Sequence, residues 1–314
     1  MRGPWIVGLL LAASLLGACG DPVSDDGAVP PKREPAPTVV RSRGAVLPPE
    51  ASASRDASNK AGGSRTKAPV VLYLGDSLAV ENQQVLGREL RDRAGARYRS
   101  APYPGTALCD YLEGPTERSL VPARDKAAAL VRATRPDYVV LQFWGNAWGY
   151  TPCMRGITHD RARNAYLTRY ASDAERLTEQ IEAAAGDGRP RIVWVLQGPD
   201  AIAPDRVRRI NSVYEERAAA SGDLLADAGG AVSPASDRYA WTRYLPCTAY
   251  EREHSAYCTQ PGQDRTALHR ADDHLHFCLA PTTATPRPCP VPSPGIRRMA
   301  EAIARTVAED AARR

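Results

Sequence analysis

The chain has 314 residues, of which 43% are hydrophobic and 25% are charged, and its formal net charge at pH 7 is +5. This composition is ordinary for a globular protein, and the length allows one sizeable domain with appended segments. The basic residues form no dense Lys/Arg patch with interleaved aromatic residues, which argues against nucleic acid as a partner.

The first 19 residues, MRGPWIVGLLLAASLLGAC, have the features of a secretion signal. Arg2 supplies the positive start, and residues 5–16 form an apolar stretch that is short for a membrane span. The sequence LGAC at 16–19 resembles a bacterial lipobox, which implies that Cys19 becomes the lipidated first residue of the mature protein. The alternative is an ordinary secretory signal that is cleaved nearby. Both interpretations predict an extracytoplasmic protein, either anchored to the bacterial cell membrane as a lipoprotein or secreted.

Residues 20–67 are rich in Pro, Ala, Ser, Gly and Asp and have no periodic apolar face. Such a segment cannot bury enough apolar surface to offset the entropy of ordering it. We therefore expect a disordered tether here, followed by one folded domain over residues 68–314.

Within residues 68–314, apolar runs typical of buried strands alternate with segments of helical periodicity. In chain order the pattern predicts strand 70–74, helix 78–93, strand 97–100, helix 122–134, strand 137–143, helix 157–185, strand 191–196, helix 205–220, strand 224–226 and helix 295–311. Strands that alternate with long helices indicate an α/β fold with a parallel sheet covered on both faces. A functional site is then expected at the carboxyl ends of the strands.

Residues 229–270 interrupt this alternation, because they are polar, rich in Tyr and without a clear period. The segment contains two cysteines. We expect a disulfide-pinned insertion near the site, where it shapes the substrate pocket.

Without Cys19, six of the seven cysteines remain, and an even number in an exported domain favours disulfides. Sequence proximity suggests two pairs and leaves a third: Cys247 with Cys258, Cys278 with Cys289, and Cys109 with Cys153. A zinc site is the rival interpretation, because His254 lies between Cys247 and Cys258, but no Cys-x-x-Cys spacing supports it.

Polar residues and a glycine that suit acyl-transfer chemistry follow several of the expected strands. Ser77 directly follows the first strand in VVLYLGDSLAV, Gly105 follows the second in PYPGTALCD, and Asn146 follows the third in LQFWGNAWGYTPC. Asp273 and His276 lie in ADDHLHFC, shortly before the last helix. Taken singly, Ser77 could cap the following helix and Asn146 could be a turn residue.

The order Ser, Gly, Asn and Asp-x-x-His resembles the GDSL, or SGNH, hydrolase family, and the likeness extends from about residue 68 to the C-terminus. It implies a three-layer α/β/α sandwich with a five-stranded, flavodoxin-like parallel sheet. Two positions depart from the family's pattern: Ala147 stands where the family often has Asp, and His274 stands where it often has Gly. Neither departure removes a catalytic group.

The resemblance implies a serine esterase with Ser77 as the nucleophile, His276 as its base and Asp273 as the carboxylate that orients the base. It also implies an oxyanion hole. Its donors would be the backbone N–H groups of Ser77 and Gly105 and the side-chain amide of Asn146.

Neighbouring residues admit other interpretations. Asp76 fits a structural hydrogen-bonding residue better than a catalytic acid. Arg270 and Trp144 are candidates for the pocket lining, and His274 fits a pocket or surface residue better than a second base. A metal site is conceivable from a set whose mixed spacing matches no metal motif: His269, Asp272, His274 and His276. We therefore expect neither a metal nor a cofactor.

These residues predict a tethered extracytoplasmic serine hydrolase that cleaves carboxylic esters through an acyl-enzyme on Ser77. Acetyl or short acyl esters, on small molecules or on glycans, are the expected substrates, and a monomer is expected. A lipase or phospholipase and an O-acyltransferase of the same fold are enzymatic alternatives. A non-catalytic binding lipoprotein is the alternative from another class. The polar insertion at 229–270 argues against a large apolar trough for long acyl chains.

Overall fold

The structure, a computed structural model, describes residues 67–114, 119–144, 152–281, 283 and 287–314. Three of the predicted features lie outside the described residues: the signal segment with Cys19, all but the last residue of the tether, and the oxyanion candidate Asn146. The chain divides into two units, Met1–Gly62 and Gly63–Arg314, and all described residues belong to the second.

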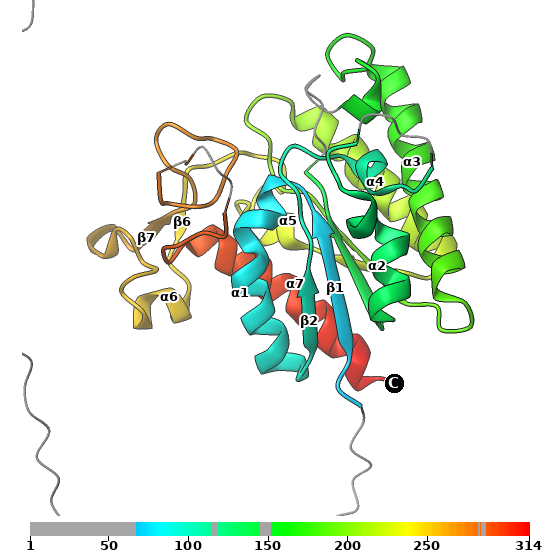
Figure 1. Cartoon of the computed structure of the whole chain (residues 1–314). Helices are drawn as coiled ribbons and strands as arrows, with labels where there is room; N and C mark the ends of the chain where they lie inside the picture. The colour runs from blue at the N-terminus through cyan, green and yellow to red at the C-terminus, as the bar shows by residue number, and fades with distance from the viewer. Residues whose placement is uncertain (1–66, 115–118, 145–151, 282, 284–286) are drawn as a thin grey trace, which may run out of the picture. The chain divides into compact units, whose positions relative to one another are not determined.

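A five-stranded parallel sheet forms the centre of the second unit (Figure 1). Its strands are β1 (Val70–Gly75), β2 (Arg97–Ser100), β3 (Tyr138–Gln142), β4 (Arg191–Val195) and β5 (Leu224–Ala226). The strand order is β2-β1-β3-β4-β5, which is the flavodoxin-like order. All five strands lie where the sequence pattern predicted them, and the predicted fold class is confirmed.

Helices cover both faces of the sheet and make three layers (Figure 1). The long helices are α1 (Ser77–Ala94), α2 (Ala127–Thr134), α3 (Arg163–Ala185), α4 (Pro204–Ser221) and α7 (Pro294–Ala312). In β1, Leu72 and Leu74 belong to the core shared with α2, α3 and α4, whereas Val71 and Tyr73 belong to the core shared with α1 and α7. A strand packed on both faces needs apolar side chains at successive positions, which is why these strands read as continuous apolar runs.

The helix predicted over 122–134 begins later than expected, at Ala127. Residues Ala123–Asp125 form a separate 3-10 turn, and Lys126 between the two has an extended backbone with ψ of 149°. The ammonium group of Lys126 is buried and donates hydrogen bonds to the Asp110 carbonyl and the Ser119 hydroxyl. This tertiary contact fixes Lys126 outside the helix.

The helix predicted over 157–185 also starts later, at Arg163. Arg155 and Gly156 before it have φ values of 52° and 77°, in the left-handed region. Ala162, with φ of −149°, is the non-helical residue that precedes the helix. Turns therefore replace the first predicted residues of this helix.

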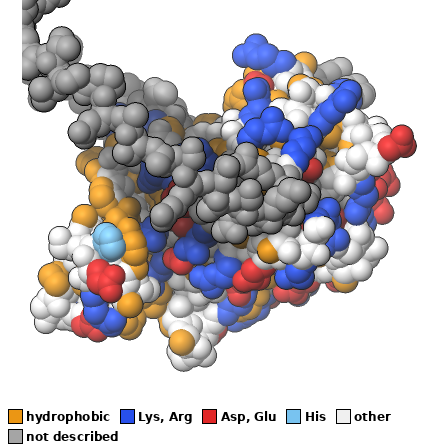
Figure 2. Space-filling model, turned by 90° about the horizontal axis from the view of Figure 1, so that it is seen from below, with side chains coloured by type: hydrophobic (Ala, Val, Ile, Leu, Met, Phe, Trp, Pro, Cys, Tyr) orange, Lys and Arg blue, Asp and Glu red, His pale blue; other side chains and the backbone are white. Residues whose placement is uncertain are grey.

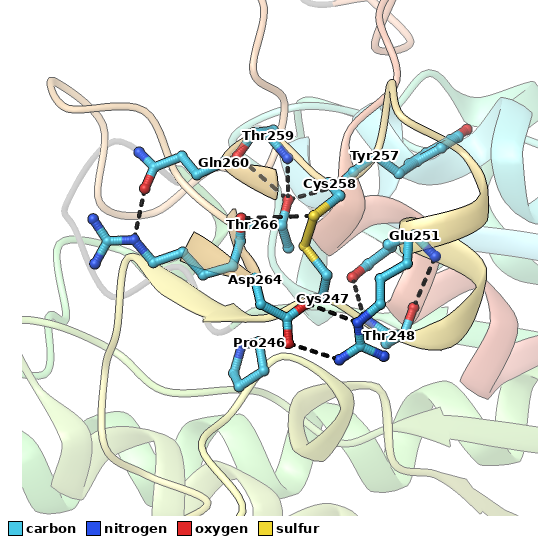
Figure 3. Close-up of a disulfide and its surroundings, with 12 residues drawn as sticks. Pro246, Cys247, Thr248, Glu251, Tyr257, Cys258, Thr259, Gln260, Asp264 and Thr266 are labelled. Carbon is cyan, nitrogen blue, oxygen red and sulfur yellow. Dashed lines mark hydrogen bonds and ion pairs between the residues drawn. A yellow bond between two sulfur atoms is a disulfide. The ribbon is translucent and has the colours of Figure 1, made fainter. Parts of the chain in front are cut away.

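The predicted insertion at 229–270 contains a small antiparallel sheet. Its elements include β6 (Tyr244–Pro246), α6 (Ala249–Glu253) and β7 (Arg265–Ala267), with β6 paired to β7. The Cys247–Cys258 disulfide holds this region together (Figure 3). Its Sγ atoms are bonded to each other, so neither cysteine is a thiolate ligand for zinc.

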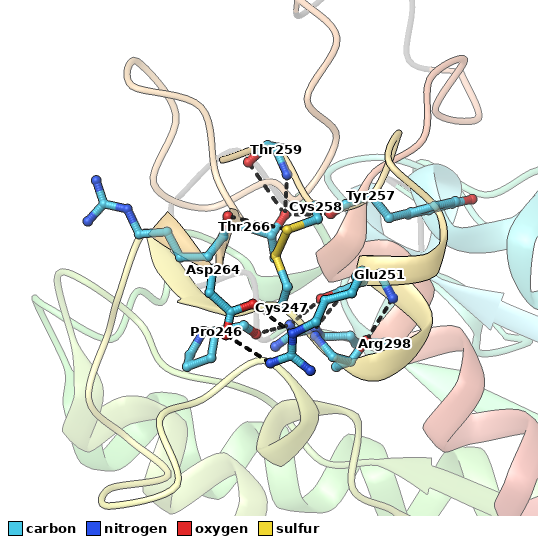
Figure 4. A network of polar contacts seen from close by, with 12 residues as sticks. Pro246, Cys247, Glu251, Tyr257, Cys258, Thr259, Asp264, Thr266 and Arg298 are labelled. Atoms are coloured by element: carbon cyan, nitrogen blue, oxygen red, sulfur yellow. Dashed lines mark hydrogen bonds and ion pairs between the residues drawn. A yellow bond between two sulfur atoms is a disulfide. The ribbon is translucent and has the colours of Figure 1, made fainter. Parts of the chain in front are cut away.

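Arg298 of α7 attaches the insertion to the sandwich (Figure 4). Its guanidinium lies 2.6 Å from Glu251 Oε2 and donates to the Pro246 carbonyl at 2.7 Å. The Glu251 side chain is buried, so this ion pair is shielded from solvent. Removal of either partner would leave the other as an unpaired buried charge, which is destabilising.

Among the residues that the structure describes, no helix is long and apolar enough to cross a membrane. On the face seen in Figure 2, basic and acidic side chains lie beside one another.

Candidate active site

The carboxyl ends of β1, β2 and β3 meet where the chain changes its direction of winding, since it runs from β1 outward to β2 and then back across to β3. Sites of open α/β sheets form at such switch points. Gly75 ends β1 without room for a side chain, because a Cβ atom there would lie 2.2 Å from the Gln142 carbonyl oxygen of β3. Ser77 begins α1 two residues later.

Asp76, and not Ser77, caps α1. Its Oδ1 accepts a hydrogen bond from the Leu78 N–H at 3.1 Å, and its Oδ2 accepts one from the Trp144 N–H at 2.7 Å. Asp76 therefore joins the start of α1 to the segment after β3. Burial raises the pKa of Asp76 to about 6, although these hydrogen bonds act in the opposite direction. The structural role expected for this residue agrees with its contacts, and the Ser77 hydroxyl is left for other chemistry.

Ser77, His276 and Asp273 form a continuous line of hydrogen-bonding contacts. Ser77 Oγ lies 3.1 Å from His276 Nε2, and His276 Nδ1 lies 3.0 Å from Asp273 Oδ2. The serine and the histidine are 199 positions apart in the chain. The fold thus brings together three of the residues that the sequence singled out.

The segment that carries His276 is held from several sides. Asp273 Oδ1 accepts from the backbone N–H groups of Leu275 and His276, each at 3.0 Å. His269 Nδ1 lies 2.9 Å from the His276 carbonyl oxygen, and Trp241 donates to the His274 carbonyl at 3.0 Å. The Trp241 ring also stacks on the His269 ring. Residues of the insertion therefore hold the backbone of the His276 segment in place.

The electrostatics suit a histidine base. Burial alone would lower the pKa of His276, but its hydrogen bond to Asp273 and the nearby carboxylates raise it above the usual value. Burial would raise the pKa of Asp273, but the hydrogen bonds from His276 outweigh it and hold that pKa well below the usual range. Burial lowers the pKa of His269 to about 4, so this ring is neutral and donates from Nδ1.

Gly105 lines the same cavity as Ser77 and His276. Its φ is 73°, a left-handed conformation that glycine adopts without the strain a side chain would add. Its predicted position beside the nucleophile agrees with the structure. Its role as an oxyanion donor, and that of Asn146, stay predictions.

The Cys109–Cys153 disulfide joins the segments that follow β2 and β3. Cys109 lies in the 3-10 helix Leu108–Tyr111 and Cys153 in the 3-10 helix Pro152–Met154. The two cysteines thus link the loop of Gly105 to the segment that follows Asn146. All three suggested pairings are present.

A cavity of about 300 Å³ opens beside Ser77. The chain between Cys278 and Cys289, which a disulfide closes, contributes more of the cavity's described lining residues than any other segment. The lining residues include Val80, Ala280, Pro281, Pro290, Arg270 and Arg287. From the predicted insertion only its last residue, Arg270, is among the described residues that line this cavity, so the pocket is shaped mainly by a different loop. Trp144 is buried and is not among the lining residues.

Glu81 is a site residue that the sequence reasoning missed. It lines the cavity, and its side chain accepts hydrogen bonds from the two residues that follow His276. The signal was present, because Glu81 lies four positions after Ser77 and a helix places such residues on one face.

Three of the four residues considered for a metal, His269, Asp272 and His276, have other side-chain contacts. Asp272 pairs with Arg270, and His269 is engaged with the His276 carbonyl. His276 itself contacts Ser77 and Asp273. In the described part of the chain, one group of possible ligand atoms lies close together, at Cys109, Asp110 and Cys153, and both cysteines are in a disulfide.

No protein-family model matches the sequence, and no curated protein matches it. Solved structures are similar to it at low identity. A family 3 carbohydrate esterase from Clostridium thermocellum is 11% identical, with 79% of this chain and 98% of that chain covered and a TM-score of 0.45. A lipolytic protein of the G-D-S-L family from Desulfitobacterium hafniense is 13% identical, with 76% and 99% covered and a TM-score of 0.44.

The C-terminal catalytic domain of peptidoglycan O-acetyltransferase A from Streptococcus pneumoniae is also similar, at 13% identity. The match covers 77% of this chain and 96% of that chain, with a TM-score of 0.38.

Proposed function

We propose that this protein is a serine hydrolase that cleaves carboxylic esters through an acyl-enzyme on Ser77. The observation that carries the proposal is the line of contacts from Ser77 Oγ through His276 to Asp273, at 3.1 and 3.0 Å. A serine hydroxyl becomes a good nucleophile when a neighbouring base removes its proton. A carboxylate on the other ring nitrogen fixes the tautomer of that base and stabilises its cationic form.

In the acylation step, Ser77 Oγ attacks the carbonyl carbon of the ester while His276 Nε2 takes the hydroxyl proton. The bond from that carbon to the alcohol oxygen then breaks, and His276 gives the proton to the leaving alcohol. In deacylation, water loses a proton to His276 and attacks the acyl carbon. Ser77 leaves with that proton, and a carboxylic acid is released.

The negative oxygen of each tetrahedral intermediate needs hydrogen-bond donors. The Ser77 N–H is at the first turn of α1, where backbone N–H groups are not used inside the helix. The backbone N–H of Gly105, which lines the same cavity, is the proposed second donor, and the side-chain amide of Asn146 is the proposed third. The loss of one such donor typically reduces the rate by about 10²–10³. The residues of this site supply the nucleophile, base and donors, so the reaction calls for no cofactor.

The deciding experiment is labelling with a serine-reactive fluorophosphonate. We expect the wild type to be labelled and Ser77→Ala to be unlabelled, with ester turnover reduced on the order of 10⁶-fold. Ser255→Ala removes an exposed serine of the insertion and is the matched control, with labelling equal to the wild type. Absence of label on the wild type, or equal labelling of Ser77→Ala, would refute the proposal.

We also propose a short acyl group, acetyl above all, carried by a small molecule or a glycan. The cavity of about 300 Å³ is at the small end of ligand pockets, and a disulfide closes the loop that forms its wall. The p-nitrophenyl esters of acetate and of a long-chain acid should differ in kcat/KM in favour of acetate. A strong preference for the long chain would instead favour a lipase, and acyl transfer to an added glycan at the expense of hydrolysis would favour an O-acyltransferase.

We propose that the protein works outside the cytoplasm, anchored through Cys19, and that it acts as a monomer. Three disulfides in one domain support the location, because such bonds persist in oxidising compartments.

A further inference from the structure

Glu81 stands one helical turn after Ser77 and lines the same cavity. The side chains of both residues lie on the face of α1 that the His276 segment covers, since each contacts that segment. The proposed mechanism uses Ser77 and His276 and assigns no task to Glu81.

The Glu81 side chain holds the backbone just after His276. Its Oε2 accepts from the Phe277 N–H at 3.1 Å and from the Cys278 N–H at 3.2 Å. A carboxylate that accepts backbone N–H groups forms stronger bonds than a neutral acceptor, and two such bonds fix both the distance and the orientation of the segment.

The Glu81 backbone contacts the far end of the loop that lines the cavity, at Cys289. Its carbonyl oxygen accepts from the Cys289 N–H at 3.2 Å. Because Cys278 and Cys289 are joined by a disulfide, Glu81 contacts both ends of the loop between them. One residue of the nucleophile helix therefore locates both the base and the wall of the cavity.

We propose that Glu81 is a positioning residue for His276, which fixes the histidine segment against α1 and whose negative charge stabilises the imidazolium formed when His276 takes the Ser77 proton. The inference rests on the proposed function, since it takes His276 as the base. A merely structural role for Glu81 would need the two backbone contacts and not the charge.

The charge of Glu81 acts on His276 together with several other groups. Burial raises the pKa of Glu81 to about 7, and the neighbouring His276 acts to lower it. The Glu81 charge in turn raises the pKa of His276. Only burial and the hydrogen bond to Asp273 have a larger influence on that pKa. In the described residues, the other titratable or charged groups around His276 are Asp76 just before α1, His269, Asp273 and His274 from its own segment, and Arg270 and Arg287 on the cavity wall.

The test removes the negative charge of the Glu81 side chain while keeping its size and shape. Glu81→Gln retains an oxygen that can accept both N–H groups, whereas Glu81→Ala removes it. Glu309→Gln, at an exposed glutamate near the end of α7, is the matched control for the loss of one negative charge. The His276 imidazole is titrated by NMR in the full chain of each variant, and kcat/KM for p-nitrophenyl acetate is measured against pH.

We expect His276 to titrate at a lower pH in Glu81→Gln than in the wild type and in Glu309→Gln. The sign follows because the lost carboxylate no longer favours the cationic ring. Since kcat/KM requires neutral His276 in the free enzyme, its acid limb should move to lower pH in Glu81→Gln. The plateau above that limb should fall on the order of tenfold, and that of Glu81→Ala on the order of 100-fold, because the base is also displaced.

An unchanged His276 titration in a folded Glu81→Gln would overturn the inference, as would equal losses in Glu81→Gln and Glu81→Ala without movement of the acid limb. The NMR titration needs no turnover, so it decides the role of Glu81 even if Ser77→Ala shows that the esterase proposal is wrong. Failure of either proposal is therefore distinguishable from failure of the other.

Discussion

At the scale of single residues, the two oxygens of Asp273 have separate tasks. Oδ2 faces the His276 ring, and Oδ1 accepts from the backbone of Leu275 and His276. One carboxylate thus shapes the turn and orients the ring that the turn presents. Most substitutions of this side chain would affect both tasks. Asparagine keeps an oxygen that accepts from the turn and changes only the group that faces the ring.

We predict that Asp273→Asn lowers kcat by about 10³–10⁴-fold while the domain stays folded. The amide oxygen can still accept from the turn, but its NH₂ group would face Nδ1 and favour the wrong tautomer of His276. Kinetics with p-nitrophenyl acetate and circular dichroism check this outcome. Asp187→Asn, at an exposed position after α3, is the control. A loss of less than about tenfold would remove Asp273 from the proposed triad.

At the scale of elements, the junction of β1 and α1 explains why a serine here need not cap the helix. Asp76 takes the cap and also reaches the Trp144 N–H, so that the start of α1 and the end of β3 are connected. Gly75 permits this, because the strands approach each other too closely there for a side chain. The nucleophile is therefore presented by backbone geometry that the neighbouring residues fix.

The Cys109–Cys153 disulfide adds a covalent link between the segments after β2 and β3. We predict that Cys109→Ala/Cys153→Ala loses about 2–4 kcal/mol of unfolding free energy and also loses kcat on the order of tenfold. The second loss is expected because the segments of Gly105 and Asn146 are no longer joined. Denaturant unfolding and ester kinetics measure the two effects.

The matched control is Cys247→Ala/Cys258→Ala, which removes the disulfide of the insertion. We expect it to lose stability with a smaller change in kcat, because this disulfide lies within the insertion and does not join the segments of Gly105 and Asn146. Equal losses of kcat in the two double variants would show that the first disulfide has no special part in the site.

At the scale of the whole molecule, the described residues of the proposed site come from three distant parts of the chain: the turn after β1, the loop after β2 and the segment before α7. Packing of α7 beside α1 brings the last of these to the first, since both helices share one core on the same face of the sheet. The Arg298–Glu251 ion pair then attaches the insertion to α7, and Trp241 of the insertion supports the His276 turn.

Cys19→Ser tests the membrane attachment that we propose for the full chain. Without the thiol no lipid can be added at this position, so we expect the variant to leave the membrane fraction while keeping its esterase activity. Fractionation of cells that express the wild type or the variant measures this. If both versions are soluble and secreted, the signal is an ordinary secretory one.

The sequence by itself determined the five strands, the fold class and the three disulfide pairs. Buried parallel strands such as YVVLQ of β3 are apolar on both faces and stand out without any tertiary information. Two of the cysteine pairs were suggested by proximity along the chain, and the third pair was the one that remained. Ser77 and Gly105 could be placed together because the carboxyl ends of parallel strands share one edge, whereas His276 was expected from the resemblance of its Asp-x-x-His pattern.

Only the tertiary structure decided the contacts that join segments far apart in the chain. Glu81 meets Phe277 and Cys278 because α1 packs beside the segment before α7, and no local pattern encodes that distance. Burial of the Lys126 ammonium against the Asp110 carbonyl likewise makes the predicted helix begin later than its local pattern indicates. Local patterns report which surface of an element is buried, whereas topology and packing decide what it is buried against.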